Sequence, residues 1–344
     1  MYGVGYIYLS SKIRVLETRL PDETDLERML DAPDLATAFK VLNDTDYADN
    51  LAEIKPEDYR DVLRDDFQQM FDFFQKIIPQ RALFDLIMLE RDFVNLRLLF
   101  KAKYFEADVA EHIKENAVYP AKHLKDYVFE NHAHPPEDLQ KAIEGDGKSL
   151  DYDIKEVVYQ VNKKITEKTA PDDIDAMLTQ YYFDLKLKKA KDIGSKFIKK
   201  DVQMIIDTTN VLIWVRAKRM GLSKDQLKTK LINGGHADIK KLIALYPEET
   251  RGLKPFINAN FDNKVNEVFE KFLEDDNLFE LEKAFEDWKI RHARETKNFS
   301  YGPEVVYGYS LAKKNAVSNV SIILTGKLNK MPKEEIKKTL RETF

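Results

Sequence analysis

The chain has 344 residues, of which 43% are hydrophobic and 33% charged, with 12 glycines and 12 prolines. This composition is typical of a globular, mainly helical protein, and the length allows two or three domains of roughly 100–150 residues each. The formal net charge of −5 argues against broad binding to a nucleic-acid backbone, which needs a basic face.

The sequence also argues against cysteine-based sites, membrane helices and a secretory signal. The chain contains no cysteine, which rules out disulfides, thiolate metal sites and cysteine nucleophiles. Its longest apolar runs, such as 211–215, fall far short of the ~20 residues that a membrane helix needs. The first ten residues lack the basic start of a secretory signal. We therefore expect a soluble protein without a membrane span.

The first fifty residues predict three short helices. The first runs over 6–17 and ends near Leu20, and Asp22 with Asp25 can cap a second helix. After a break at 31–34 the apolar spacing predicts a third helix from Leu35 to Leu42. The local pattern is therefore helix, short turn, helix.

One stretch of the chain occurs three times. NLRLLFKAK at 95–103 returns as NVLIWVRAK at 210–218 and as NVSIILTGK at 319–327, so the three starts are 115 and 109 residues apart. On a helix, offsets 0, 3, 4 and 7 share one face. That face carries an Asn, two large apolar residues and a small residue in every copy, and offset 8 is always Lys. The repeated positions are Asn95, Ala102, Lys103, Asn210, Ala217, Lys218, Asn319, Gly326 and Lys327.

Each repeated position has a physical reading. The apolar pair predicts a buried face, and the small residue lets a neighbouring backbone come close. A buried Asn must spend its amide on hydrogen bonds, for which the neighbour's backbone is the expected partner, because an unpaired amide costs roughly 1–3 kcal/mol. The Lys marks the helix end, where a cation suits the negative end of the helix dipole.

A long helical arm precedes each copy, and the repeat extends into it. Leu63 and Leu178 both stand 32 residues before their Asn. In the third copy the arm is interrupted at Gly302 and Pro303. No run of alternating apolar and polar residues predicts a strand, so the predicted fold is all-α, with three similar helical domains. We expect the helical units to cover 56–150, 151–265 and 266–344, with 1–55 completing the third.

Three motifs could indicate a nucleotide, metal or catalytic site, but the residues around them do not support such a site. The stretch 142–149 fits a relaxed phosphate-loop pattern, but a polar segment precedes it where the mechanism needs a buried strand. His123, His132, His134 and Glu137 lie in a proline-rich region that offers no rigid metal scaffold. Acidic pairs, among them 65–66, 172–173 and 275–276, are expected on solvated faces and at helix N-termini. We expect no catalytic residues, no metal and no cofactor.

Four segments together resemble a known family. They are YLSSKIRVLE at 8–17, MLDAPDL at 29–35 followed by DTDY at 44–47, DFVNLRLLFKAK at 92–103, and GKLNKMP at 326–332. In this order and spacing, the chain resembles the C subunit of prokaryotic V-type and A-type ATP synthases, relatives of the d subunit of the eukaryotic vacuolar ATPase. The likeness extends over nearly the whole length.

The resemblance implies a fold and a role. It implies three helical domains arranged as a funnel with pseudo-threefold symmetry, and a non-catalytic subunit on the cytoplasmic face of the membrane. There it would link the proteolipid rotor ring to the central stalk, with the D and F subunits of the stalk as partners, and transmit torque for ion transport or ATP synthesis.

Cationic ends of the repeated stretches are weak candidates for a partner surface, because Lys and Arg more often only cap exposed helix ends. These candidates are Arg97, Lys101, Arg216 and Arg219. Two other functions are left open by the sequence. One is a helical scaffold that binds unrelated protein partners in a concave surface. The other is an enzyme built on the 142–149 loop.

Overall fold

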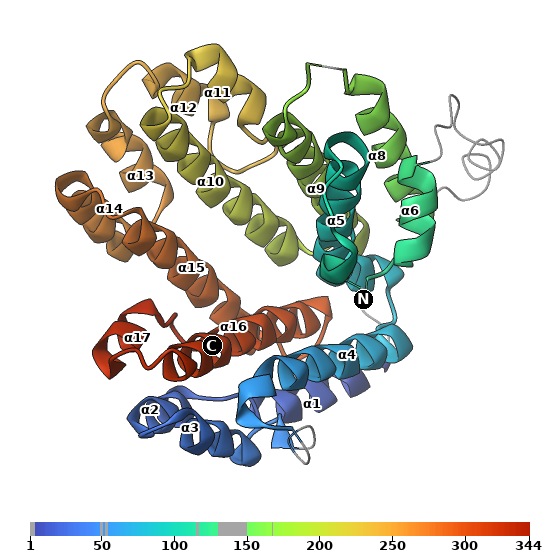
Figure 1. The fold of residues 1–344 in the computed structure, drawn as a ribbon, viewed down its shortest axis with the longest axis vertical. Coiled ribbons are helices and arrows are strands. Elements are labelled where there is room, and N and C mark those ends of the chain that lie inside the picture. Colours follow the sequence, from blue (N-terminus) through green and yellow to red (C-terminus); the bar gives the residue numbers. More distant parts are fainter. Residues whose placement is uncertain (1–3, 49–50, 52–53, 115–116, 130–149, 167) are drawn as a thin grey trace. The chain divides into compact units, whose positions relative to one another are not determined.

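The computed structural model describes residues 4–48, 51, 54–114, 117–129, 150–166 and 168–344. All regular secondary structure in these ranges is helical, which confirms the all-α prediction (Figure 1). The chain divides into two compact units. Unit 1 consists of Met1–Gln80 and Thr250–Phe344, and unit 2 of Arg81–Glu249. The division into three similar domains and the pseudo-threefold funnel stay predictions.

Unit 1 contains the helices from both ends of the sequence. They are α1 (Val4–Glu17), α2 (Glu23–Asp31), α3 (Leu35–Val41), η1 (Leu42–Asp44), η3 (Pro56–Asp58), α4 (Tyr59–Ile77), η5 (Thr250–Leu253), α13 (Lys254–Asn260), α14 (Asn263–Asp275), α15 (Leu278–Arg294), η6 (Glu295–Asn298), α16 (Pro303–Leu328) and α17 (Lys333–Thr339).

Unit 2 contains the remaining helices. They are α5 (Arg81–Phe105), η4 (Ala110–His112), α6 (Ala121–Phe129), α8 (Leu150–Lys164), α9 (Pro171–Ile193), α10 (Lys196–Arg219), α11 (Lys224–Lys230) and α12 (Ile239–Leu245).

Helices α2 and α3 begin at aspartates that cap their N-termini. Asp22 accepts a hydrogen bond from the backbone of Asp25, whose side chain in turn accepts from the backbone of Asp22, so the two form a capping box at the start of α2. Asp34 caps α3 in the same way by accepting from the backbone of Thr37. In the third arm the predicted interruption is confirmed, because α15 ends at Arg294 and α16 begins at Pro303.

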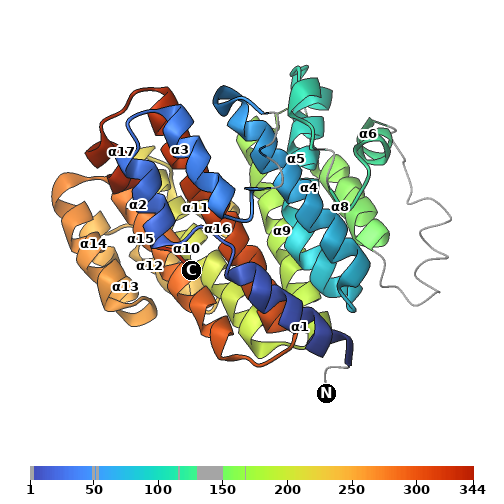
Figure 2. The ribbon, with the colours of Figure 1, turned by 90° about the horizontal axis from the view of Figure 1, so that it is seen from below.

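The core of unit 1 joins the two ends of the sequence. Helices α2 and α3 lie beside α16 and α17 in two perpendicular views (Figures 1 and 2). Met29, Ala38 and Leu42 from the N-terminal helices share one buried cluster with Ile323 of α16 and Ile336 of α17. Because buried apolar area is the main favourable term in folding, this cluster makes 1–48 and 303–339 parts of one folding unit.

Helix α1 is tied to the segment after α15 by a single arginine. Arg14 Nη2 donates to the backbone oxygens of Thr296 (2.9 Å) and Phe299 (2.7 Å). Its Nη1 pairs with Glu17 at 2.7 Å. The guanidinium therefore links α1 to backbone carbonyl groups of the segment 296–299.

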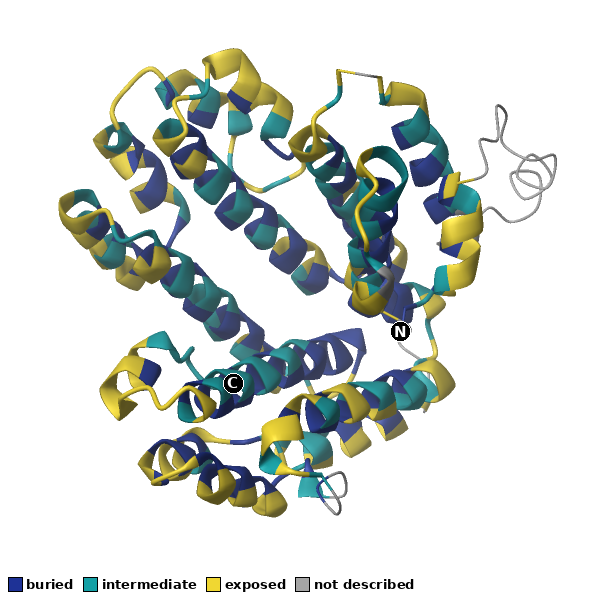
Figure 3. Cartoon of the chain, in the orientation of Figure 1, coloured by how far each residue is buried: buried dark blue, intermediate teal, exposed yellow. Residues whose placement is uncertain are grey.

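Unit 2 is built around α9. Helix α9 packs against α5, α8 and α10 (Figure 1), and its buried residues Ile174, Leu178 and Leu185 join α5 and α8 in one apolar cluster. The long helices carry their buried residues on continuous faces, whereas α16 is buried or half-buried around most of its circumference (Figure 3). Because α16 is buried on most sides, it is the central helix of unit 1, and its buried polar residues, such as Lys313 and Asn319, need partners within the core.

Candidate functional site

The three repeated asparagines bind the backbone of the chain in the same way. Each side-chain amide donates to the carbonyl oxygen and accepts from the N–H of one and the same residue, and each asparagine is no more than 3% exposed. The pairs are Asn95 with Lys114 (both bonds 2.7 Å), Asn210 with Ile232 (both 2.8 Å) and Asn319 with Arg341 (3.1 and 3.0 Å). We call this arrangement the amide clamp. It fastens an extended segment to the long helix before it in α5, α10 and α16.

A buried aspartate reinforces the clamp in two copies. Asp92 accepts from the backbone N–H of Tyr119 at 2.8 Å, and Asp207 accepts from those of His236 and Ala237 at 3.1 Å. Burial raises the pKa of Asp92 to about 7 and that of Asp207 to about 6, against the lowering effect of these hydrogen bonds. Sequence reasoning missed both residues. The signal was an Asp three positions before the Asn in two copies.

The glycine pair at 234–235 is explained by this second anchor. A Cβ atom added to Gly235 would lie 2.1 Å from Asp207 Oδ1, and Gly234 has a φ of 96°. Only glycine allows the backbone to approach the carboxylate so closely and turn there. The glycine turn at 234–235 is therefore part of the clamp.

The third copy replaces the aspartate by two other residues. Ala316 occupies the position equivalent to Asp92 and Asp207. Instead, Asn315 donates to the carbonyl oxygen of Glu342 at 2.8 Å, and Asp287 of α15 accepts from the N–H of Glu342 at 2.7 Å. The extended segment 341–342 is thus held at all four main-chain polar groups by side chains of α15 and α16.

The lysine at offset 8 contacts the helix packed beside it in each copy. Lys103 donates to the carbonyl of Val128 in the last turn of α6 (2.7 Å), and Lys327 donates to Leu30 in the last turn of α2 (2.7 Å) and to Ala32 just beyond it. Lys218 lies over the ring of Tyr246, at 4.6 Å from its centroid. The ammonium groups of Lys103 and Lys327 thus bind carbonyl groups at the C-terminal ends of neighbouring helices, where the helix dipole is negative.

The small residue at offset 7 is packed most closely in the third copy. A Cβ atom on Gly326 would lie 2.5 Å from Cγ1 of Ile336 in α17. Ala217 is buried, whereas Ala102 is half-buried. The close approach expected of a small residue is therefore present in α16.

The cations proposed as a partner surface differ in their surroundings. Lys101 pairs with Asp175 of α9 at 2.9 Å, and Arg97 donates to Thr179 of the same helix at 3.2 Å. Arg216 and Arg219 are exposed in the last turn of α10. Arg97 and Lys101 thus contribute to packing in unit 2, whereas Arg216 and Arg219 are exposed at the end of α10.

Each unit also contains a buried lysine between two aspartates, which the sequence did not reveal. Lys313 of α16 is 3% exposed and contacts Asp66 of α4 (2.7 Å) and Asp46. Lys189 of α9 is 2% exposed and contacts Asp153 (3.0 Å) and Asp85 (3.5 Å). Each lysine therefore joins three segments of the chain. Removing one member of such a buried ion pair leaves an unpaired buried charge, which is strongly destabilising.

The expectation of solvated acidic pairs was wrong for Asp66. It is 4% exposed, whereas its neighbour Asp65 has a half-exposed side chain. Burial raises the pKa of Asp66 to about 6, despite the opposing charge of Lys313. The pair 172–173 lies in the first turn of α9, as predicted, but 275–276 are exposed residues at the C-terminal end of α14.

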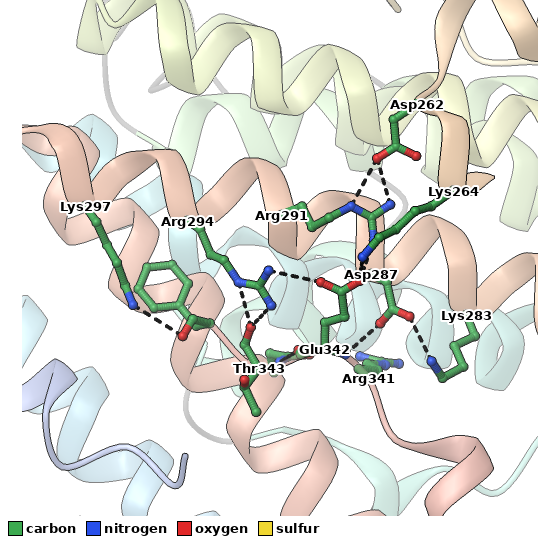
Figure 4. A network of polar contacts seen from close by, with 12 residues as sticks. Asp262, Lys264, Lys283, Asp287, Arg291, Arg294, Lys297, Arg341, Glu342 and Thr343 are labelled. Carbon is green, nitrogen blue, oxygen red and sulfur yellow. Dashed lines mark hydrogen bonds and ion pairs between the residues drawn. The ribbon is translucent and has the colours of Figure 1, made fainter. Parts of the chain in front are cut away.

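A network of charged side chains surrounds Glu342 (Figure 4). Its carboxylate contacts Lys264 of α14 (3.1 Å) and both Arg291 (2.7 Å) and Arg294 (3.0 Å) of α15. Arg294 also donates to the carbonyl oxygen of Thr343 at 2.8 Å. Two cavities lie beside this segment, one of about 280 Å³ lined by Glu342 and one of about 540 Å³ lined by residues 343 and 344.

The discounted motifs remain largely outside the structure. The 142–149 stretch, His132, His134 and Glu137 lie outside the described residues. His123 of α6 packs against the ring of Tyr119. Among the residues that the structure describes, no group of three or more histidines and acids is placed to hold a metal ion, and none of the described helices is long and apolar enough to cross a membrane.

Comparison with known proteins assigns the family. The model of the ATP synthase (C/AC39) subunit matches residues 9–339. The C subunit of the A-type ATP synthase of Thermococcus kodakarensis is 25% identical over 314 residues, which cover 86% of this chain and 78% of the relative. The C subunit of the V-type sodium ATPase of Enterococcus hirae is 18% identical over 340 residues, which cover 98% of this chain and 99% of the relative. Because the family model spans nearly the whole sequence, the chain belongs to the ATP synthase (C/AC39) subunit family.

Proposed function

We propose that this chain is a non-catalytic rotor adaptor of a V/A-type rotary ATPase. In this role it binds the proteolipid rotor ring at the cytoplasmic face of the membrane as a peripheral subunit, and it receives the central stalk, formed by the D and F subunits. It transmits torque between the ATP-hydrolysing head and the ion-transporting membrane sector. Family membership over residues 9–339 is the observation that carries the proposal.

The internal construction of the chain supports a mechanical role. A torque adaptor must resist deformation, and closely packed interiors have low compressibility. The amide clamps fasten extended segments to α5, α10 and α16, and the buried lysines Lys189 and Lys313 each tie three segments together. Such features stiffen a helical body against shear without providing a reaction centre.

The exposed end of α10 is the proposed contact for an acidic partner surface. Arg216 and Arg219 lie in its last turn, where Met220 is 63% exposed. Arginine beside an exposed apolar side chain is a frequent combination in protein interfaces. Arg97 and Lys101 contribute less to this surface, because they are only half-exposed.

The test is ATP-driven ion uptake by membrane vesicles from cells that lack this chain, with the purified protein added back. We expect vesicles without the chain to show ion uptake lowered at least ten-fold, and uptake to return with the wild-type protein. A tagged chain should recover the rotor ring and the stalk proteins from detergent-solubilised membranes. Normal ion uptake without the chain, or recovery of unrelated proteins only, would favour the helical scaffold instead.

A further inference from the structure

Residues 340–344 follow α17 as an extended segment, which we call the strap. The backbone of Leu340 has φ −68° and ψ 142°, and no regular secondary structure follows it. The strap runs beside α15 (Figure 4) and reaches α16 through Asn319 and Asn315. Its polar groups must therefore find partners among side chains.

Side chains of α15 and α16 form hydrogen bonds with the main chain of the strap at two consecutive residues. Asn319 binds the N–H and the carbonyl of Arg341, while Asp287 and Asn315 bind the N–H and the carbonyl of Glu342. Asn319 and Asn315 are 1% and 4% exposed, and Asp287 is 7% exposed. Because every peptide unit offers these same groups, this part of the recognition does not depend on which side chains the bound segment carries.

The carboxylate of Glu342 makes recognition of the strap depend on a side chain. Lys264, Arg291 and Arg294 converge on it from two different helices, at 3.1, 2.7 and 3.0 Å. Partial burial opposes ionisation, but hydrogen bonds from Lys264 and Arg291 hold the pKa of Glu342 below its ordinary value. Charge-assisted hydrogen bonds of this kind are roughly twice as strong as neutral ones. The nearby acids Asp262 and Asp287 contact Arg291 and Lys283, respectively.

The same construction serves two other segments of the chain. Asn95 and Asp92 hold residues 114 and 118–119 through main-chain groups, and Asn210 and Asp207 hold residues 232 and 236–237. In the third copy, three cations surround one carboxylate of the bound segment. The third copy therefore has a feature that discriminates between segments, whereas the fully described segment 232–237 of the second copy carries no carboxylate.

We propose that the surface formed by α14, α15 and α16 around the strap is a binding site for extended peptides that carry a carboxylate at the position of Glu342. In this chain the strap fills the site in cis. The ligand class is an acidic linear segment, recognised by its backbone through Asn319, Asn315 and Asp287 and by its carboxylate through Lys264, Arg291 and Arg294. This inference is independent of the proposed role in torque transmission.

The test weakens the strap in cis and supplies it in trans. The full-length chain with Glu342→Gln keeps the main-chain groups but loses the carboxylate. Two fluorescently labelled peptides of residues 338–344, KTLRETF and its Gln counterpart KTLRQTF, are titrated into it and followed by fluorescence anisotropy. The full-length Glu335→Gln chain is the matched control, because it removes one exposed negative charge from α17 without touching the network. Circular dichroism checks that each chain is folded.

We expect KTLRETF to bind the Glu342→Gln chain at least ten-fold more tightly than KTLRQTF does. We also expect it to bind that chain at least ten-fold more tightly than it binds the Glu335→Gln chain, whose strap still competes. Adding Arg291→Gln to the Glu342→Gln chain should abolish the preference between the two peptides. Equal binding of both peptides, or binding of neither to a folded chain, would overturn the proposal. Should the Glu342→Gln chain not fold, Glu342→Asp keeps the charge but shortens the side chain by one methylene, which weakens the contacts of the strap with the three cations. KTLRETF should then still bind that chain more tightly than KTLRQTF does.

Discussion

A single buried asparagine can satisfy both polar groups of one residue of the backbone. The amide carries one acceptor oxygen and an NH₂ donor group, which match the N–H and C=O of one residue in extended conformation. In this protein the match occurs at Asn95, Asn210 and Asn319. Among uncharged side chains, Gln carries the same amide but places it one methylene further from the helix, so the clamp depends on Asn for both its chemistry and its reach.

Replacing Asn210 by Leu should destabilise unit 2. The substitution leaves the N–H and carbonyl of Ile232 buried without partners. At about 1–3 kcal/mol for each unsatisfied group, partly offset by the added apolar side chain, we expect a loss of roughly 2–4 kcal/mol in the free energy of unfolding. Urea denaturation measures it.

The control for this prediction is Asn258→Ala. Asn258 is exposed in α13, so the exchange should change the free energy of unfolding by no more than about 0.5 kcal/mol. Asn210→Asp provides a second comparison, since it keeps the acceptor but loses the donor to Ile232. If Asn210→Leu unfolds at the same urea concentration as the wild type, the clamp contributes nothing to stability.

Replacing Lys313 by Met should destabilise unit 1 in a way that depends on pH. The change leaves Asp46 and Asp66 facing each other without their cation, beside the rings of Tyr47 and Tyr309. Removing one partner of a buried ion pair costs about 3–5 kcal/mol at neutral pH. In the wild type, burial already raises the pKa of Asp66 to about 6, and loss of the ammonium group raises it further.

The sign of the pH dependence follows from the bound protons. Between its folded pKa and its ordinary value of 3.8, Asp66 holds a proton in the folded state but not in the unfolded state. The free energy of unfolding therefore increases as the pH falls through this window. We expect the loss caused by Lys313→Met to be smaller at pH 5 than at pH 8 in urea denaturation. Lys271→Met, at an exposed position of α14, should show no such dependence, and a loss of equal size at both pH values would contradict the prediction.

At the scale of elements, the contact between α16 and α17 depends on a missing side chain. The Cβ atom of an alanine at 326 would lie 2.5 Å from Ile336 Cγ1, and Ile336 is 1% exposed. Alanine gains about 1 kcal/mol of helix propensity over glycine, whereas overpacking typically costs about 1–3 kcal/mol. The clash should win, so we expect Gly326→Ala to lower the melting temperature.

A double-mutant cycle separates the clash from other effects. Ile336→Ala removes the atoms that an alanine at 326 would meet, so in that background Gly326→Ala should be neutral or stabilising. The difference between the two backgrounds, measured by urea denaturation, is expected to be about 1–3 kcal/mol. Equal effects of Gly326→Ala in both backgrounds would show that α17 does not pack as described.

The elements were predictable where local chemistry decides them. The cap at Asp22 and the interruption before Pro303 depend on neighbouring residues and were predicted from the sequence pattern. The burial of Asp66, Lys189 and Lys313 was not predictable in this way, because charged residues are rarely buried and their partners lie far away in the sequence. Repeat comparison gave the asparagines, but the residues that they bind are set by tertiary packing.

At the scale of the whole molecule, unit 1 is discontinuous in sequence and unit 2 is not. Residues 81–249 form an insertion between the two parts of unit 1. The core of unit 1 needs both parts, because Val320, Ile323 and Leu324 of α16 are buried against α2 and α3. Lys313 likewise finds its two carboxylates in the N-terminal part, at Asp46 and Asp66.

We therefore predict that a fragment of residues 250–344 lacks stable tertiary structure by itself. Alone, it would expose the apolar face of α16 and leave Lys313 without Asp46 and Asp66, so little buried area would remain to offset the loss of conformational entropy. Mixing it with a fragment of residues 1–80 should restore near-ultraviolet circular dichroism and a cooperative melting transition. The contiguous fragment 81–249 is the control, since both anchors of its clamps are included. If 250–344 alone melted cooperatively at the temperature of the mixture, the N-terminal helices would be attached to a completed domain, and their buried cluster would not be the core of unit 1.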